Sequence, residues 1–443
     1  MCDSAVATGP ATASGQTLFA KNSDRHAGEC QPFVQFAAAD YAHGPGEKLA
    51  CTHIAIDQAP RTRRVMGHSP WWVWGFEHGV NAEGLAIGNQ SVFSREPVEE
   101  APGLIGMDLV RLGLERSASA REAIEVIAGL LEAHGQGGSG FGPGEGGYHN
   151  SFSLADPEEA WLMETSGRHY AATRVESGSL SNHMSIGAMS IGPTSTGADW
   201  SRASDDLEAF ARAEGWWSGD GPVDVAAAYR NANVPGFISE GRLARSAEWL
   251  REGRGRHDVR GMIALLRDHG APGAPPPAGL APDDIARYTL CMHAEPVGTT
   301  TASLVAELPR DRSRPWPVWV SFGSPCLGVF LPVYLEGEVP AALARGGEHP
   351  SVANEPSAWW AFHELQAGEA AHSPALPEPV RTAWAGFEAE TERGRIAAEK
   401  EAAALVAAGE PRESAAVLTA FMEATAKAAL GRARALAQAL GAG

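Results

Sequence analysis

Cysteine is scarce in this chain, which limits the disulfide and metal chemistry that the sequence can signal. The 443 residues include five cysteines, an odd number, and none of them stands in a Cys-x-x-Cys pair. A disulfide framework and a zinc site therefore both lack their usual sequence signature. We expect no metal and no cofactor, and a reducing compartment suits free thiols.

Basic residues and long apolar runs are also in short supply. Lysine and arginine total 35 against 54 acidic residues, a net charge of −19. Without a basic stripe, nucleic acid and anionic membranes are poor partners. No apolar run reaches the roughly 20 residues that span a bilayer, and no signal-peptide pattern opens the chain. We expect a cytoplasmic protein and leave a homo-oligomer open.

Cys2 is the most informative residue that is present. Removal of Met1 would leave a terminal residue that carries both a thiol nucleophile and a free α-amino group. An α-amine has an ordinary pKa near 8, so part of it is neutral at pH 7 and can accept the proton of the thiol. Cys2 alone is a weak signal, because any small residue at this position lets the methionine be trimmed.

A hairpin at the start of the chain strengthens the signal from Cys2. Residues 4–8 and 16–22 read as strands, and residues 9–15 carry the Gly, Pro and Ser of a turn. Antiparallel pairing about this turn places Cys2 opposite the neighbourhood of residues 22–24.

The segment that the hairpin delivers to Cys2 is charged. The carboxylate of Asp24 could orient the terminal amine, and Lys21 or Arg25 could favour the thiolate. A polar strand end in solvent is the structural alternative for both cations.

The rest of the chain alternates strand-rich and helical blocks. Ser119 and Glu122 form a capping box that opens a helix. The stretch 135–147 contains eight glycines and follows a helix, which excludes dinucleotide binding. We read it as a lid or a pocket edge, with a plain flexible loop as the alternative. From about residue 356 the chain becomes rich in Ala, Glu and Arg and predicts two or three helices. These residue patterns by themselves indicate an α+β protein, but they do not specify the order in which its strands pair.

These motifs resemble the secernin and bacterial dipeptidase branch of the N-terminal-nucleophile hydrolases, which is related to the bile-salt and penicillin V acylases. The similar segments run in order over residues 2–335 and include Cys2-Asp3, Phe19 to Arg25, Trp74 to Glu77, Gly79 to Leu85, Gly106 to Leu109, His149 to Phe152 and Cys291 to His293. The resemblance implies a four-layer αββα sandwich, with two antiparallel sheets between helical layers. We expect this domain over residues 1–345 and a helical C-terminal extension over residues 346–443.

Acyl transfer by a thiol needs donors for a developing oxyanion, and the resemblance suggests asparagines for them. Asn89 fits the spacing better than Asn81, which reads as a turn residue. Asn182 is the second candidate. The related acylases also place a late arginine near the terminal cysteine, and Arg202 stands there. Where they have an arginine before the Asn-x-Asp element, this chain has Lys21.

The candidate site is therefore as follows. The catalytic candidates are Cys2, Asp24, Asn89, Asn182 and Arg202. The substrate-binding candidates are Asn22, Arg25 and His149, although a lone histidine is more often structural. Cys291 and His293 share a strand face and could meet, but with Cys2 available we treat them as core.

The first function hypothesis is a cysteine amidohydrolase that cleaves short peptides through an acyl-enzyme, as the dipeptidase relatives imply. An acylase acting on N-acyl amino acids or a peptide natural product would share the nucleophile and differ in the pocket. The remaining alternative is a secernin-like regulatory or binding protein without hydrolytic turnover.

Overall fold

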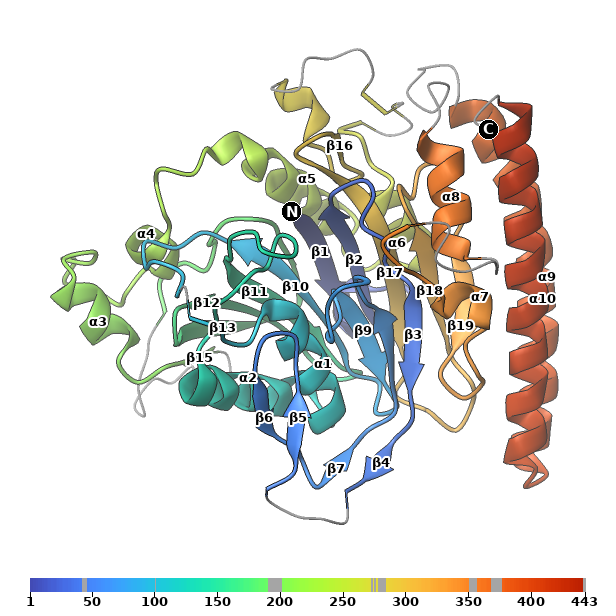
Figure 1. Ribbon diagram of the computed structural model, residues 1–443, viewed down its shortest axis with the longest axis horizontal. Helices are drawn as coiled ribbons and strands as arrows, with labels where there is room; N and C mark the ends of the chain where they lie inside the picture. Colours follow the sequence, from blue (N-terminus) through green and yellow to red (C-terminus); the bar gives the residue numbers. More distant parts are fainter. Residues whose placement is uncertain are drawn as a thin grey trace.

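Two antiparallel sheets form the centre of the molecule (Figure 1). The computed structural model describes residues 1–41, 46–99, 101–189, 201–271, 274, 276–277, 284–349, 357–367 and 377–440. Most of the Pro- and Gly-rich connection expected at residues 270–282 lies outside these ranges.

The first sheet contains the N-terminal hairpin at its centre. Its strand order is β14 (Ser177–Leu180), β1 (Cys2–Ala7), β2 (Thr17–Arg25), β17 (Gly298–Leu308), β18 (Pro317–Phe322) and β19 (Leu331–Tyr334), with β16 (His293–Ala294) paired to β17.

The second sheet is built from strands between residues 33 and 203. Its order is β15 (Ser201–Ala203), β13 (His169–Val175), β12 (Ala160–Ser166), β11 (His149–Ala155), β10 (Ala86–Val92), β9 (His78–Asn81), β8 (Val65–His68) and β3 (Phe33–Phe36). Two small ribbons pair β4 (Ala39–Asp40) with β7 (Arg61–Thr62), and β5 (Lys48–Ala50) with β6 (Ala55–Asp57).

Side chains alternate between the two faces of each sheet and create three apolar layers. Val6 and Phe19 of the first sheet pack against Leu162 of the second, so they lie between the sheets. The adjacent residues Ala5 and Leu18 face the other way, toward α5 (Glu240–Glu252) and α6 (Val259–Leu266). Residues of the second sheet, such as Ile87 and Phe152, pack beneath α1 (Gly106–Arg116) and α2 (Ala120–His134). The expected four-layer αββα sandwich is confirmed.

Local signals account for several element ends. Ser119 caps α2 by accepting a hydrogen bond from the Glu122 amide at 3.2 Å, and Glu122 Oε2 accepts from the Ala118 amide at 2.5 Å. Asn81 shapes the turn after β9, because its Oδ1 accepts from the amides of Glu83 at 2.9 Å and Leu85 at 3.1 Å. Both sequence expectations are confirmed.

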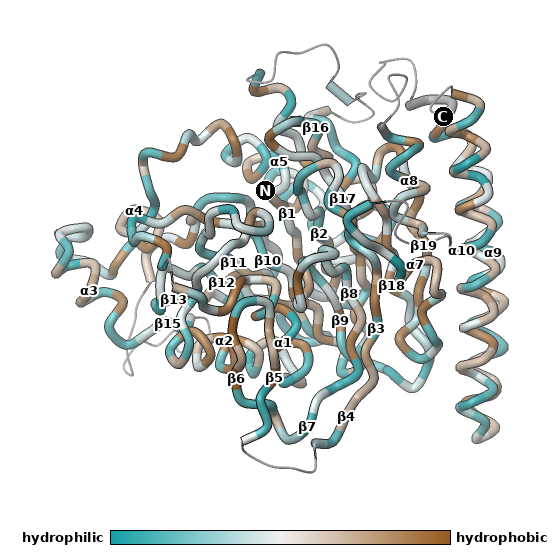
Figure 2. Tube along the Cα trace, viewed as in Figure 1, coloured by the Kyte–Doolittle hydropathy of each residue, from teal (hydrophilic) through white to brown (hydrophobic). Residues whose placement is uncertain are grey.

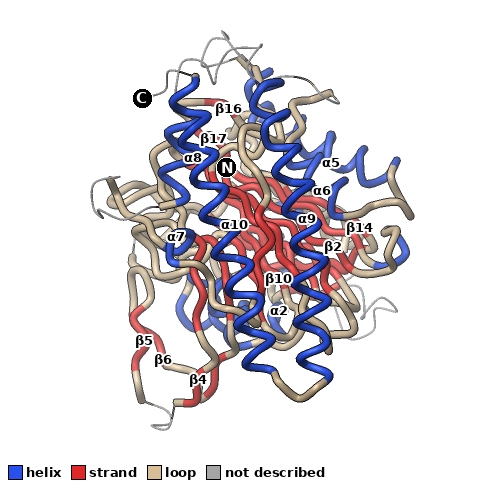
Figure 3. Tube along the Cα trace, turned by 90° about the vertical axis from the view of Figure 1, so that its right-hand side faces the viewer, coloured by secondary structure: helices blue, strands red, loops and turns tan. Residues whose placement is uncertain are grey.

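The C-terminal helices lie in front of the sheets in the view of Figure 3, and two of them contact the strands β18 and β19. They are α7 (Ala341–Ala344), α8 (Ala358–Ala367), α9 (Pro377–Ala407) and α10 (Pro411–Ala439), and the short helices α3 (Leu207–Ala213) and α4 (Val225–Tyr229) lie near β13 and β15. Hydrophilic and hydrophobic segments alternate along α9 and α10 (Figure 2). Trp359 and Trp384 join the core between the sheets, and their indole N–H groups donate to the carbonyls of Thr301 and Leu327, each at 3.0 Å. No helix within the described ranges has both the length and the apolar character to cross a membrane.

Candidate active site

The hairpin delivers Cys2 to the segment expected from the sequence. In the ladder between β1 and β2, Cys2 pairs with Ser23 and Asp3 pairs with Asn22. The register therefore confirms that Cys2 lies opposite residues 22–24. Because the strand alternates, the Cys2 side chain faces the space between the sheets and the Asp3 side chain faces α5.

The Cys2 thiol lies in a buried charged environment. Its Sγ is 3.8 Å from Glu77 Oε2, and Lys21 Nζ is 3.2 Å from the same carboxylate oxygen. Burial raises the pKa of the Cys2 thiol, the Lys21 ammonium opposes this effect, and the Glu77 carboxylate adds to it. For Glu77 itself, burial tends to raise the pKa, but Lys21 and Arg25 outweigh it and hold the pKa below its ordinary value.

The nitrogen of Cys2 is held by Asn182, which follows β14. The Cys2 N–H donates to Asn182 Oδ1 at 3.0 Å, and Arg242 Nη2 donates to the same oxygen at 2.6 Å. Asn182 Nδ2 donates to the carbonyl oxygen of Ser91 at 2.9 Å and to its hydroxyl at 3.0 Å. With the amide orientation fixed by these partners, Asn182 acts as an acceptor for the Cys2 nitrogen, whereas the sequence suggested an oxyanion donor.

Arg242 of α5 is the cation that reaches this end of β1. Its guanidinium contacts the Asp3 carboxylate through Nη1, which also lies 3.7 Å from Asp24 Oδ2. The side chain of Arg242 is 1% exposed. One buried arginine thus compensates two buried carboxylates and also orients Asn182.

Asp24 lies beside Met1 and on the Arg242 side of the hairpin. The amino group of Met1 donates to the Asp24 carbonyl at 2.6 Å, and the Asp24 amide donates to the Met1 carbonyl at 2.8 Å. The Thr300 hydroxyl donates to Asp24 Oδ1 at 2.7 Å, while Oδ2 has no hydrogen-bond donor among the described residues. Burial and the nearby Asp3 raise the pKa of Asp24 to about 7, although Arg242 acts in the opposite direction.

Arg25 connects the site to the glycine-rich loop. Its Nε lies 2.7 Å from Glu29 Oε1 and 3.7 Å from Glu77 Oε1. Its Nη2 donates to the carbonyls of Gly140 and Phe141, both at 2.9 Å. These contacts hold the loop against the Cys2 site, and its role as a lid or pocket edge stays a prediction.

The structure does not bring Asn22 to the site, and strand alternation is the reason. Asn22 faces α6, where its Nδ2 donates to the carbonyls of Leu266 at 2.9 Å and Leu290 at 2.7 Å. Its Oδ1 accepts from the Ser303 hydroxyl at 2.7 Å. The amide is committed to structural hydrogen bonds on the opposite face from the Cys2 thiol, so the expected contact with substrate is corrected.

Asn89 and Asn81 also point away from Cys2. Asn89 faces α1, and its Nδ2 donates to Asn150 Oδ1 at 3.1 Å. Asn81 Nδ2 donates to the carbonyls of Leu114 at 2.9 Å and Ser117 at 2.8 Å. Neither amide is directed at the thiol, which corrects the expected oxyanion donor at Asn89.

Arg202 lies far along the second sheet, on the edge strand β15. Its Nε is 3.6 Å from Glu125 Oε1 of α2, and its guanidinium carbon lies 5.8 Å from the ring centroid of Trp161. Trp161 packs in the layer beneath α1 and α2. Arg202 is therefore on the helix-covered face of the second sheet, whereas Cys2 faces the other sheet. Arg242 stands where the late arginine was expected.

His149 lies at the start of β11. Its Nδ1 is 2.8 Å from the Ser94 hydroxyl, and burial lowers its pKa to about 4. Both residues line a small cavity of about 200 Å³. The imidazole is neutral at pH 7, and a contact with substrate stays a prediction.

Three residues of the site, Arg242, Asp3 and Glu77, were not among the candidates from the sequence. Asp3 and Glu77 stand within the motifs that resemble the dipeptidase family, so those motifs could have pointed to them. Arg242 carries no local signal, because it is one of several arginines along α5.

One known protein family matches part of this chain. Residues 76–234 match the model of peptidase family C69. Probable dipeptidase B of Lactococcus lactis subsp. lactis (strain IL1403) is 25% identical over 192 residues, which cover 39% of this chain and 36% of that protein. The match thus spans about a third of the relative's length.

Two solved structures are similar at low scores. A C2A mutant of the conjugated bile acid hydrolase from Clostridium perfringens has 13% identity and a TM-score of 0.39, covering 73% of this chain and 89% of that chain. Penicillin V acylase from Agrobacterium tumefaciens has 14% identity and a TM-score of 0.41, covering 75% of this chain and 86% of that chain. The match of residues 76–234 to peptidase family C69 and the similarity to probable dipeptidase B confirm the resemblance to the bacterial dipeptidase family.

Proposed function

We propose that this protein is a cysteine amidohydrolase of the N-terminal-nucleophile type that cleaves short peptides. The observation that carries the proposal is the buried placement of Cys2, with its nitrogen on Asn182 at 3.0 Å and its sulfur 3.8 Å from Glu77. A thiol and a nitrogen of one residue, each held by a separate polar partner, suit the pairing of a nucleophile with its own base.

Cleavage of the bond between Met1 and Cys2 would create the working site. The Cys2 nitrogen would become an amine that keeps Asn182 Oδ1 as acceptor. The Asp24 amide and carbonyl, which now pair with Met1, would lose those partners at the same place. A freed N–H and C=O at a strand end can pair with the backbone of an extended peptide, which favours a peptide substrate.

The reaction would then run through a thioester. The amine of Cys2 accepts the thiol proton, and Sγ attacks the substrate carbonyl to form a tetrahedral oxyanion. The C–N bond breaks as the ammonium returns its proton to the leaving amine. Water, deprotonated by the same amine, hydrolyses the thioester and regenerates the thiol.

Lys21 and Arg242 have separate tasks in this scheme. The Lys21 ammonium stabilises the thiolate while it pairs with Glu77 at 3.2 Å. Arg242 positions the nitrogen side through Asn182, and Asp24 lies 3.7 Å from Arg242, so both are positioning residues. Arg25 holds the glycine-rich loop that borders the site.

The test combines N-terminal mass analysis with turnover. We expect a chain that begins at Cys2, an alkylatable Cys2 thiol and hydrolysis in a panel of dipeptides. Cys2→Ala should abolish turnover with folding intact, and Cys51→Ala, which removes a half-buried thiol elsewhere, should not change it.

Other outcomes point to the alternatives. Hydrolysis of N-acyl amino acids without dipeptide cleavage would identify an acylase. Retention of Met1 in active protein would rule out the amine as base. A processed Cys2 with no turnover of either substrate class would support a regulatory or binding protein.

A further inference from the structure

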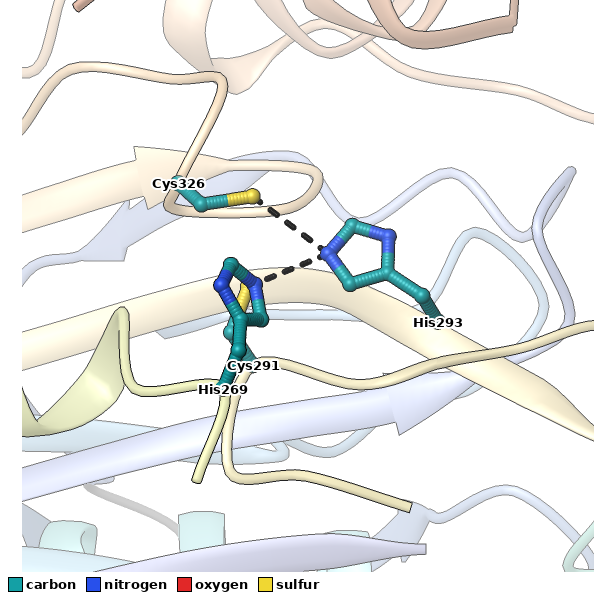
Figure 4. A group of neighbouring side chains, drawn as sticks. All are labelled: His269, Cys291, His293 and Cys326. Atoms are coloured by element: carbon teal, nitrogen blue, oxygen red, sulfur yellow. Dashed lines mark hydrogen bonds between the residues drawn. The ribbon is translucent and has the colours of Figure 1, made fainter. Parts of the chain in front are cut away.

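Two histidines and two cysteines converge outside the Cys2 site (Figure 4). His269 follows α6, Cys291 and His293 flank Met292 just before β17, and Cys326 lies in the turn after β18. One nitrogen or sulfur atom from each residue lies within 4.8 Å of the other three. The two sulfurs are 3.4 Å and 3.3 Å from His293 Nε2.

The two sulfur–nitrogen separations match a tetrahedral site, and the other ligand atoms, within 4.8 Å of one another, would move closer on binding an ion. A Zn²⁺ ion with sulfur at about 2.3 Å and imidazole nitrogen at about 2.0–2.1 Å keeps neighbouring ligand atoms about 3.3–3.8 Å apart. The two measured sulfur–nitrogen distances fall at the lower end of that range. Small side-chain adjustments would place all four atoms around one ion.

His269 is oriented as a metal ligand. Its Nδ1 lies 2.9 Å from the Ala274 carbonyl, so Nδ1 carries the proton and Nε2 keeps its lone pair. Nε2 is buried and has no hydrogen-bond partner among the described residues. A backbone carbonyl that fixes the tautomer of a histidine is the usual outer partner of a metal-bound imidazole.

The donor set also identifies the kind of ion. Two thiolates and two imidazoles favour Zn²⁺ over the hard cations Mg²⁺ and Ca²⁺, which prefer oxygen. A site with four protein ligands has no open position for water, so its role would be structural.

We propose that His269, Cys291, His293 and Cys326 bind one structural Zn²⁺ ion. The ion ties together three segments that are distant in sequence. It runs against our expectation of no metal, which rested on the missing Cys-x-x-Cys pair. The ligands here come singly or as Cys-x-His, so such a pair is not required.

The proposed zinc site lies next to Thr300, the residue whose hydroxyl is hydrogen-bonded to Asp24. The Met292 amide donates to the Thr300 hydroxyl at 2.9 Å, and this hydroxyl donates to Asp24 Oδ1 at 2.7 Å. Met292 lies between two of the ligands, so the ion would fix the segment that holds Thr300. The inference does not depend on the proposed peptidase activity.

The test measures metal in the full chain, purified under reducing conditions without chelator. We expect about one zinc per chain, lowered at least tenfold in Cys326→Ser and in His269→Ala. Cys51→Ser is the matched control and should keep its zinc. Protein stripped of metal and reduced should take up Co²⁺ and show the absorption of tetrahedral thiolate coordination.

Two results would overturn the proposal. One is a reduced wild-type chain that carries no zinc as purified and takes up neither Zn²⁺ nor Co²⁺. The other is a disulfide between Cys291 and Cys326 in the purified protein that, after reduction, still binds no metal. These readouts need no substrate, and Cys2→Ala should keep its zinc whether or not it loses turnover.

Discussion

Arg242 and Asn182 are 60 residues apart in sequence, yet their side chains meet at 2.6 Å beside the nitrogen of Cys2. Because Asn182 Oδ1 accepts from both Arg242 and Cys2, the arginine fixes the group that holds the Cys2 nitrogen.

Removal of the Arg242 charge should destabilise the protein strongly. Arg242→Met leaves the buried carboxylates of Asp3 and Asp24 without their cation, which should cost about 3–5 kcal/mol in the free energy of unfolding. Arg245→Met on the same helix removes a partly exposed partner of Asp268 and should cost about 1 kcal/mol or less. Denaturant titrations compare the two, and equal losses would contradict the role assigned to Arg242.

Asp24 should make stability depend on pH. Its folded pKa of about 7 lies above the unfolded value of about 3.9, so the folded state binds the proton more tightly. Its contribution is therefore full below about pH 4 and is lost as pH rises through about 7. Asp24→Asn should lose less stability than wild type between pH 5 and pH 8.

The pH comparison has an internal control. Burial also raises the pKa of Glu164 to about 7. Asp24→Asn should therefore remove only part of the dependence of the unfolding free energy on pH, and Glu164→Gln should remove a further part. Parallel curves for wild type and Asp24→Asn would show that the Asp24 carboxyl titrates near its ordinary pKa.

Lys21 and Glu77 should change the reactivity of Cys2 in opposite directions. Lys21→Met removes the cation that lowers the thiol pKa, so less thiolate is present at pH 7 and alkylation of Cys2 should slow by about tenfold or more. Glu77→Gln removes the nearby anion and should speed it. Peptide mass spectrometry follows the rate, with Cys51 as an internal reference. Changes of the same sign in both variants would contradict this charge arrangement.

Gly106 should tolerate no side chain. A Cβ there would lie 1.9 Å from Asn150 Oδ1 and 2.6 Å from Asn89 Nδ2, so Gly106→Ala should cost about 1–3 kcal/mol. Gly129 of α2 is exposed and a Cβ there meets nothing within 4 Å. Gly129→Ala should stabilise the helix by about 0.5–1 kcal/mol. Thermal unfolding distinguishes the two, and a Gly106→Ala variant as stable as wild type would refute the close contact.

The C-terminal helices should be part of the core, although the sequence was divided into a domain over residues 1–345 and a helical extension over residues 346–443. Trp384→Ala removes a side chain that is 2% exposed and should cost about 3–5 kcal/mol. Val406→Ala, at a position 39% exposed, should change the free energy of unfolding little. If Trp384→Ala leaves the main unfolding transition unchanged, residues 346–443 fold separately from the sandwich.

Local patterns in the sequence were sufficient for the N-terminal hairpin. The Gly, Pro and Ser turn and the two strands it joins set the pairing of Cys2 with Ser23, because register follows from turn position and alternation. The capping box at Ser119 and the turn at Asn81 are local in the same sense. The same alternation, applied to β2, would have placed Asn22 on the face opposite the thiol.

Long-range packing decided which other residues join Cys2 at the candidate site. Which arginine reaches Asp3 depends on how α5 lies on the first sheet, and nothing near Arg242 in the sequence specifies that. Asn182 became an acceptor only when Ser91, Arg242 and Cys2 met around its amide. The sequence by itself determined the N-terminal hairpin, the position of Cys2 within it and the α+β class, since these rest on neighbouring residues. The tertiary structure alone decided the cation at the site and the His–Cys cluster, because their members come from segments that only the folded sheets bring together.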